Sequence, residues 1–176
     1  VRAENTRIQT ELDLSGDGSD QNYLNLFPSV FLSYSLNEQN SFQVSYSRRI
    51  DRPWSGWLLP FIEISDARNR RVGNPGLRPE FGNSFEMGYL RYWESGSILT
   101  SLYYRYRTDV TERVATIDDN GITTRRPINL ATEDAWGIEF SGDQEIFNNL
   151  QLTGSLNIFR SDRQGEYLGQ IYASET

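Results

Sequence analysis

The sequence of 176 residues contains neither cysteine nor histidine. Without thiolates and imidazoles the chain cannot form disulfides, use a cysteine nucleophile, use histidine as a general acid or base, or build the usual zinc sites. Any catalytic chemistry would have to depend on carboxylates. We therefore expect no metal site and no cofactor.

The sequence also lacks lysine, so all 17 of its basic residues are arginines, and they stand against 24 acidic residues. The net charge is −7 and the pI is near 4.7. Phosphate binding along a nucleic acid requires a basic face, so this balance argues against a nucleic-acid partner.

Long apolar runs are missing as well, and the mean hydropathy is only −0.60. No stretch approaches the roughly 18 consecutive apolar residues that a membrane-spanning helix needs. A transmembrane β-barrel remains possible, because its strands need only every second residue to be apolar.

Alternation of apolar and polar residues is what the sequence has in abundance. A period of two is typical of strands with one apolar face. A first strand is predicted over residues 7–14, and six longer strands are predicted over residues 24–36, 41–50, 83–93, 98–108, 132–146 and 150–160. Within the connection 109–131, segments 110–117 and 122–128 flank Asn120-Gly121, which predicts a protruding hairpin.

The connections between these strands differ in length. Those after residues 14, 50, 108 and 160 are long and polar, whereas those after 36, 93 and 146 are short turns. Because antiparallel neighbours alternate in direction, all long connections should lie at one end of the sheet, as in transmembrane barrels. Residues 13–24 have a faint calcium-loop spacing, but Leu24 stands where that loop needs a bidentate Glu, so we expect a solvated loop at 15–22.

One segment couples a loop motif to a strand. Its loop part contains Gly73, Asn74, Pro75, Leu77, Pro79 and Glu80, and its strand carries Phe85, Met87 and Tyr89 on one face. This segment resembles the Asn-Pro-x-Leu-x-Pro-Glu segment of TonB-dependent outer-membrane receptors, which leads from an extracellular loop down a barrel strand. The loop-part residues are expected to shape the loop more than to touch ligand.

The resemblance implies an all-β fold, an antiparallel up-and-down meander that forms part of a large transmembrane β-barrel in the outer membrane of a Gram-negative bacterium. We expect residues 1–176 to be a fragment of that barrel domain, without a signal peptide, the plug or the terminal strand. The implied function is uptake of a scarce or bulky nutrient such as a metal chelate, an oligosaccharide or a peptide. The implied partners are outer-membrane lipid, the protein's own plug domain, the TonB complex and an unidentified small ligand.

The resemblance also gives roles to individual residues. Contacts with ligand or within the extracellular loops are expected from Trp54, Trp57, Arg68, Arg70 and Arg71, and ordinary solvated loop is the alternative. Lumen-facing positions are expected at Glu86, Arg105 and Glu139, with the opposite, apolar face of the strands toward lipid. Tyr92 and Trp93 are expected in an aromatic girdle, or alternatively in a sandwich core.

Two other protein classes fit part of the sequence. A soluble β-sandwich that binds carbohydrate through Trp54 and Trp57 would explain the strands and the aromatic residues, but not the sorting of loops by length. A glycoside hydrolase would need two carboxyl groups across a cleft. Glu139, Asp143 and Glu145 share one strand face, which disfavours that reading.

Overall fold

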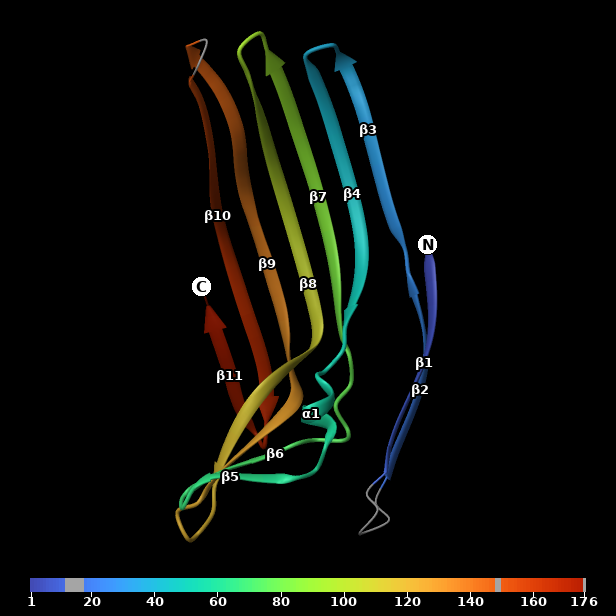
Figure 1. Ribbon diagram of the computed structural model, residues 1–176, viewed down its shortest axis with the longest axis vertical. Coiled ribbons are helices and arrows are strands. Elements are labelled where there is room, and N and C mark those ends of the chain that lie inside the picture. The colour runs from blue at the N-terminus through green and yellow to red at the C-terminus, as the bar shows by residue number, and fades with distance from the viewer. Residues whose placement is uncertain (12–17, 148–149, 176) are drawn as a thin grey trace.

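The computed structural model describes residues 1–11, 18–147 and 150–175, and it is built almost entirely from strands (Figure 1). The elements in chain order are β1 (Arg2–Glu11), β2 (Gly18–Phe27), β3 (Ser29–Asn37), β4 (Asn40–Asp51), α1 (Ser55–Leu58), β5 (Ile62–Asp66), β6 (Asn69–Val72), β7 (Glu80–Trp93), β8 (Gly96–Ile117), β9 (Thr123–Phe147), β10 (Leu150–Tyr167) and β11 (Gln170–Glu175).

The main sheet is an open antiparallel meander. Its strand order is β11-β10-β9-β8-β7-β4-β3, while β1 and β2 pair with each other in a separate two-stranded ribbon. The short strands β5 and β6 pair together, and β6 adds to β9 in parallel. The predicted all-β meander is therefore confirmed. In the described part of the chain, no helix is long and apolar enough to cross a membrane.

The turns predicted after residues 36 and 93 lie at one end of the sheet, and the connections predicted after residues 50 and 108 lie at the other (Figure 1). The β3–β4 and β7–β8 turns lie at one end, together with the adjoining ends of β9 and β10; the predicted turn at 148–149 falls outside the described residues. The opposite end carries the β4–β7 connection, which holds α1, β5 and β6, and the far halves of β8 and β9. The β4–β7 connection is long, as predicted, whereas the β8–β9 and β10–β11 turns at the same end are short because their strands continue beyond the predicted ends.

The prediction of a long connection after residue 160 was wrong. Strand β10 continues to Tyr167 and turns directly into β11 through Leu168 and Gly169. Both turn residues have positive φ, 51° and 75°, as a tight two-residue hairpin turn requires. The extension of β10 is held by hydrogen bonds from Arg163 to carboxylates on β8 and β9. Because its residues are mostly polar, it has no apolar alternation from which a strand could be predicted.

The prediction of a single strand over residues 24–36 was also wrong, because Pro28 separates β2 from β3. Proline has no N–H to give to a ladder, and here its carbonyl accepts from the backbone of Arg48 at 3.1 Å. Strand β2 begins at Gly18, inside the predicted loop, and pairs with β1, which begins at Arg2 instead of residue 7. The faint calcium-loop spacing falls largely on residues 12–17, outside the described residues.

The predicted hairpin at 110–128 is confirmed, but it is a continuation of β8 and β9 and not a separate unit. The two strands pair from Gly96 and Gln144 as far as Ile117 and Thr123, with register shifts next to Asp109. Asp109 has φ of 56°, the left-handed conformation in which Asp and Asn are tolerated, and this residue bends β8. At the tip, the Asp118 carboxylate accepts from the backbone N–H groups of Asn120 and Ile122.

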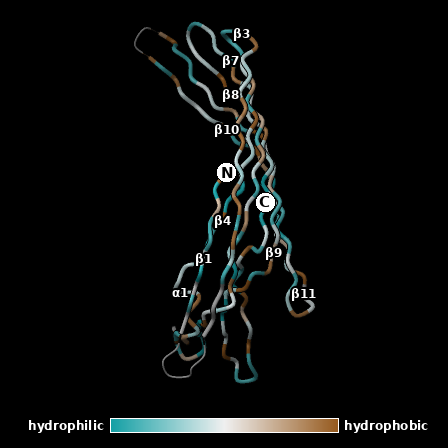
Figure 2. Tube along the Cα trace, turned by 90° about the vertical axis from the view of Figure 1, so that its right-hand side faces the viewer, coloured by the Kyte–Doolittle hydropathy of each residue, from teal (hydrophilic) through white to brown (hydrophobic). Residues whose placement is uncertain are grey.

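The strand register places apolar and polar residues on opposite faces of the sheet, and Figure 2 shows the two hydropathies alternating along the strands. We call the face that carries Met87 the apolar face. Its central row, in which each residue is paired with the next across the sheet, is Leu32, Val44, Met87, Leu102, Ile138 and Ile158. The row on its long-connection side is aromatic, with Tyr46, Phe85, Tyr104 and Trp136.

No second sheet packs on the apolar face within the described residues. Leu32, Val44 and Phe85 are 64%, 48% and 48% exposed. A β-sandwich would bury such side chains in a dry interior. The apolar face is therefore the surface of a single layer, and buried apolar residues are instead concentrated near the long connections, for example Leu58, Leu77, Val110 and Val114.

Candidate functional site

The β4–β7 connection is fixed to its neighbours at Gly73. A Cβ atom at this position would lie 1.9 Å from the carbonyl oxygen of Leu59, so only glycine fits. The backbone N–H of Asn74 donates to the carbonyl of Trp57 at 2.6 Å. The loop motif thus begins in close backbone contact with α1.

The Asn74 side chain then fixes the turn. Its Oδ1 accepts from the backbone N–H of Gly76 at 3.1 Å and from Arg126 at 3.2 Å, while its Nδ2 donates to the carbonyl of Pro127 at 2.9 Å. Such an Asx turn lets a side chain replace backbone hydrogen bonds. Leu77 is completely buried next to this turn. Pro75 is half-buried and Pro79 is buried.

A second asparagine, Asn129 on β9, holds the end of the motif. Its Oδ1 accepts from the backbone N–H of Arg78 at 2.7 Å, and its Nδ2 donates to the carbonyls of Arg78 and Asp109 at 2.9 and 2.7 Å. The Arg78 guanidinium also pairs with the Asp109 carboxylate at 2.5 Å. The loop and the bend in β8 are therefore joined through the side chains of Asn129 and Arg78.

Glu80 begins a ladder of charges that crosses four strands. Its carboxylate accepts from the backbone N–H of Thr111 at 2.8 Å and from Arg107 at 2.5 Å. Arg107 also reaches Glu133 on β9, and Glu133 pairs with Arg163 on β10. Arg163 in turn bonds to Glu112 at 2.6 Å. The motif residues therefore make their contacts within the protein: Leu77 is buried, Asn74 forms the turn, and Glu80 forms an ion pair with Arg107.

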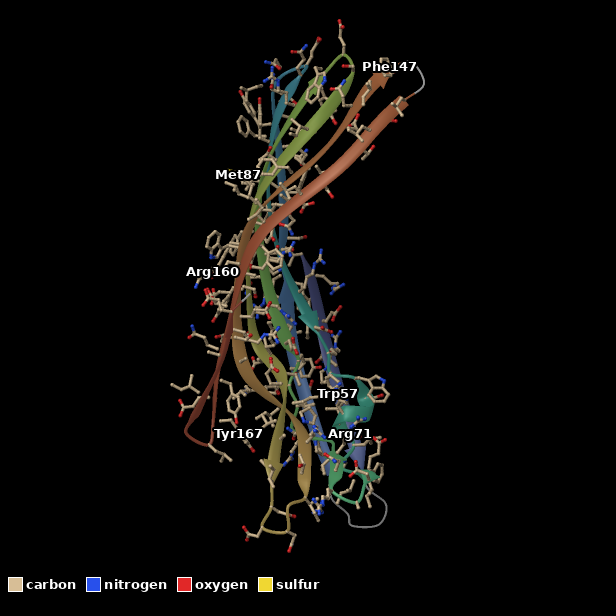
Figure 3. The ribbon with its side chains drawn as sticks, turned by 90° about the vertical axis from the view of Figure 1, so that its left-hand side faces the viewer. Trp57, Arg71, Met87, Phe147, Arg160 and Tyr167 are labelled. Carbon is tan, nitrogen blue, oxygen red and sulfur yellow. The ribbon has the colours of Figure 1, made fainter. Side chains whose placement is uncertain are left out.

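A groove lies between the β4–β7 connection and the far halves of β8 and β9. We call it the loop groove, and its volume is about 470 Å³. Figure 3 shows Trp57 and Arg71 on the side of the sheet opposite Met87. The lining residues are Trp54, Gly56, Trp57, Phe61, Glu63, Arg71, Val72, Gly73, Arg113, Arg125 and Pro127.

The residues predicted for ligand contact divide into two groups. Trp54, Trp57 and Arg71 line the loop groove. Arg70 points elsewhere, since its guanidinium pairs with Asp118 at the hairpin tip at 3.1 Å. Arg68 has an exposed side chain outside the groove, and its carbonyl accepts from the backbone of Thr123 at 2.7 Å.

Sequence reasoning missed Phe61, Glu63, Arg113 and Arg125. Arg125 reaches the groove because β6 pairs in parallel with β9, which brings Arg71 opposite Arg125. Arg113 lies on β8 opposite Pro127 of β9. No local pattern encodes a parallel contact between segments more than 50 residues apart. Only the excess of basic residues in 68–71 and 125–126 gave a signal.

The residues predicted to face the lumen share the face opposite Met87, which we call the polar face. Glu86 and Arg105 line a groove of about 550 Å³ there, together with Ser45, Ser84 and Arg107. Glu139 is opposite Ser101 and Asn157 in the same register set. Within the described residues, no group of three or more carboxylates is arranged to hold a metal ion.

Tyr92 and Trp93 lie at the short-turn end of the sheet, and alternation places them on opposite faces. Trp93 shares the face of Met87 and donates its Nε1–H to Gln144 at 2.8 Å. Tyr92 is 49% exposed on the polar face. Trp93 therefore lies on the apolar face, where a girdle residue is expected, whereas Tyr92 lies on the polar face.

Solved structures with the same fold are bacterial receptors and transporters. They include the siderophore receptor PirA from Pseudomonas aeruginosa, at 16% identity and a TM-score of 0.61 over 89% of this chain. The copper transporter OprC matches at 13% identity and a TM-score of 0.59 over 89% of this chain. The FrpB iron transporter from Neisseria meningitidis matches at 13% identity and a TM-score of 0.52 over 87% of this chain.

This chain spans 36% of the PirA chain and 26% of the OprC and FrpB chains. A search of curated proteins found no match. All 176 residues match one family description, that of the outer membrane protein beta-barrel family. The open two-faced sheet, the sorted connections and this full-length match lead to one conclusion: the chain belongs to the outer membrane protein beta-barrel family and forms part of a barrel in the outer membrane of a Gram-negative bacterium.

Proposed function

We propose that this chain is part of the barrel of an outer-membrane receptor that takes up a scarce or bulky nutrient, such as a metal chelate, an oligosaccharide or a peptide. The apolar face contacts lipid, and the polar face lines the lumen and meets a plug domain that lies elsewhere in the protein. Energy for transport comes through TonB. The names of the similar structures, a siderophore receptor, a copper transporter and an iron transporter, support uptake of a small nutrient.

The observation that supports ligand capture most directly is the position of the loop groove. It lies at the long-connection end, which is the extracellular end in outer-membrane barrels. It also lies on the side of the sheet opposite Met87, so it opens toward the lumen and away from the lipid (Figure 3). A ligand bound there would stand above the transport path.

The experiment compares a strain that lacks the gene with the same strain carrying the full-length gene. We expect at least one compound of the growth medium to be depleted only when the full-length protein is present. A protonophore, which removes the energy that TonB relays, should abolish depletion while binding to isolated outer membranes persists. If no compound depends on the gene, or if depletion continues without energy, this function is contradicted.

A further inference from the structure

The loop groove carries positive charge in a chain that is acidic overall. Three arginines and one carboxylate, Glu63, line it, whereas the whole chain has a net charge of −7. Elsewhere arginines are neutralised by partners: Arg70, Arg107 and Arg163 each form ion pairs. Among the described residues, no carboxylate forms an ion pair with Arg71, Arg113 or Arg125. Glu63 stands opposite Arg71 in the register of β5 and β6, and the charge of Arg125 acts on Asp66, so the groove has a net excess of positive charge, which favours an anion.

Two of the three guanidinium groups are held by neutral side chains. Arg113 lies over the ring of Trp57, 4.9 Å from its centroid. Arg125 donates to the side-chain oxygen of Asn69 at 3.0 Å. Arg71 stands between Glu63 and Arg125 in the register of β5, β6 and β9. Ordering before binding lowers the entropic cost of association, and a planar guanidinium matches an oxyanion with two parallel hydrogen bonds.

Aromatic rings form the other wall of the groove. Trp54 and Phe61 are 68% and 59% exposed although they lie beside the charged residues. The Trp54 ring lies directly over Gly56, because a Cβ atom there would come within 2.2 Å of it. The exposed indole offers a flat apolar surface on which a ring or another apolar group of a ligand can pack.

We propose that the loop groove binds the oxyanion of a carboxylate- or phosphate-bearing ligand through Arg71, Arg113 and Arg125, with an adjoining ring or apolar part of the ligand against Trp54 and Phe61. This assignment rests on the proposed function, because it names the chemistry of the ligand that the loops capture. A neutral sugar would leave the excess positive charge of the groove unbalanced, and a free cation would be repelled. The acidic Glu63 limits the affinity for simple anions.

The test uses the full-length protein in a non-ionic detergent and pyranine, a planar trisulfonated fluorescent dye, as the probe. We expect saturable binding by fluorescence anisotropy, displaced by citrate and by inorganic phosphate but not by maltotriose. Replacing Arg71, Arg113 and Arg125 together by glutamine should weaken pyranine binding at least tenfold. Glu63→Gln, which removes the only carboxylate among the described residues that line the groove, should strengthen binding several-fold.

A matched control is Arg68→Gln, whose arginine belongs to the same segment as Arg71 but does not line the groove. It should bind pyranine within twofold of the unchanged protein. Equal weakening in the control and the triple variant would mean attraction to general surface charge and would overturn the proposal. Displacement by maltotriose as effective as that by citrate would overturn it too.

A further measurement identifies the source of the anion. Purified lipopolysaccharide that displaces pyranine at lower concentration than citrate or phosphate would make the groove a lipid headgroup site and contradict a nutrient ligand.

Failure of the proposal has a different signature from failure of the transport function. Depletion of a neutral compound would keep the function and reject the oxyanion, whereas pyranine binding without any gene-dependent depletion would keep the site and reject uptake.

Discussion

At the scale of single residues, the loop motif is held by close backbone contact and by side-chain amides. Gly73 has no space for a side chain beside Leu59, since its Cβ would lie 1.9 Å from that carbonyl. Gly73→Ala should therefore displace α1 and destabilise the docked loop by about 1–3 kcal/mol, the usual cost of overpacking. Limited proteolysis of the full-length protein should cut the β4–β7 connection faster.

Gly154→Ala is the matched control for that change, because nothing lies within 4 Å of a Cβ at Gly154. Its proteolysis pattern should equal that of the unchanged protein. Equal cleavage rates for Gly73→Ala and the unchanged protein would show that the close approach at Leu59 is not needed.

Asn129 is the residue on which the end of the motif depends. Asn129→Ala removes hydrogen bonds to the backbone of Arg78 and to the carbonyl of Asp109. At about 1 kcal/mol for each hydrogen bond lost, the loop should be destabilised by roughly 2–4 kcal/mol. Hydrogen exchange in residues 73–80 should rise. Asn120→Ala, whose side chain makes no hydrogen bond among the described residues, should leave that exchange unchanged.

The sequence predicted part of this residue-level arrangement. Prolines and glycines in 73–79 indicated a shaped loop because they restrict or widen φ. The partners of Asn74 and Glu80 could not be predicted, because Pro127 and Thr111 approach them from β9 and β8. Contacts of this kind depend on the register of distant strands and leave no local pattern.

At the scale of elements, the β4–β7 connection contains a small hairpin that alternation did not reveal. Strand β6 is only four residues long and is basic, so it has no apolar period. Its structure comes from pairing with β5 and β9. The long strands were predicted well because each presents four or more alternating residues, whereas the extension of β10 was missed because charge pairs replace apolar contacts there.

The turn of the β5–β6 hairpin depends on Asp66. The pKa of its carboxyl lies below the ordinary value of 3.8 because the backbone N–H of Arg68 and the side chain of Asn69 donate to it. A folded-state pKa below the unfolded one means that the carboxylate stabilises the turn above pH 3.8. This contribution is lost as the pH falls through the lowered value.

Hydrogen exchange of residues 62–72, corrected for its intrinsic pH dependence, should therefore accelerate as the pH falls from about 5 to 3. Asp66→Asn keeps an oxygen acceptor without a titrating group, so exchange in that variant should not change with pH over this range. A pH response of the same size in both proteins would assign the effect to other carboxylates.

At the scale of the whole molecule, the account depends on the two faces of the sheet. Met87 and Glu86 are neighbours on β7 that point to opposite sides, with Met87 in the central apolar row. Met87→Arg would place a charge in hydrocarbon, which should cost about 2–4 kcal/mol of barrel stability near the bilayer midplane. Glu86→Arg should change stability by less than about 1 kcal/mol if the polar face is hydrated.

Urea unfolding of the full-length protein in lipid vesicles measures both variants. The same loss of stability in Met87→Arg and Glu86→Arg would mean that the two faces have the same environment. That result would be incompatible with a barrel wall.

The whole-molecule arrangement was the part best predicted from the sequence. Alternation in the long strands and the lengths of their connections are properties of the entire chain, so errors at single boundaries do not change them. Pro28 divided one predicted strand: its second half, β3, stays beside β4 in the main sheet, whereas its first half, β2, pairs with β1 in a separate ribbon.

The most direct test of the two-faced wall is a spin-label scan of β7 in the full-length protein in bilayers. These 176 residues contain no cysteine, and any cysteine elsewhere in the full-length protein is first replaced by serine. Single cysteines are then placed at Ser84, Phe85, Glu86 and Met87 and labelled one at a time. We predict that labels at 85 and 87 collide mainly with oxygen, which concentrates in hydrocarbon, and that labels at 84 and 86 collide mainly with a water-soluble nickel chelate. Equal accessibility to oxygen and nickel at all four positions would contradict the account.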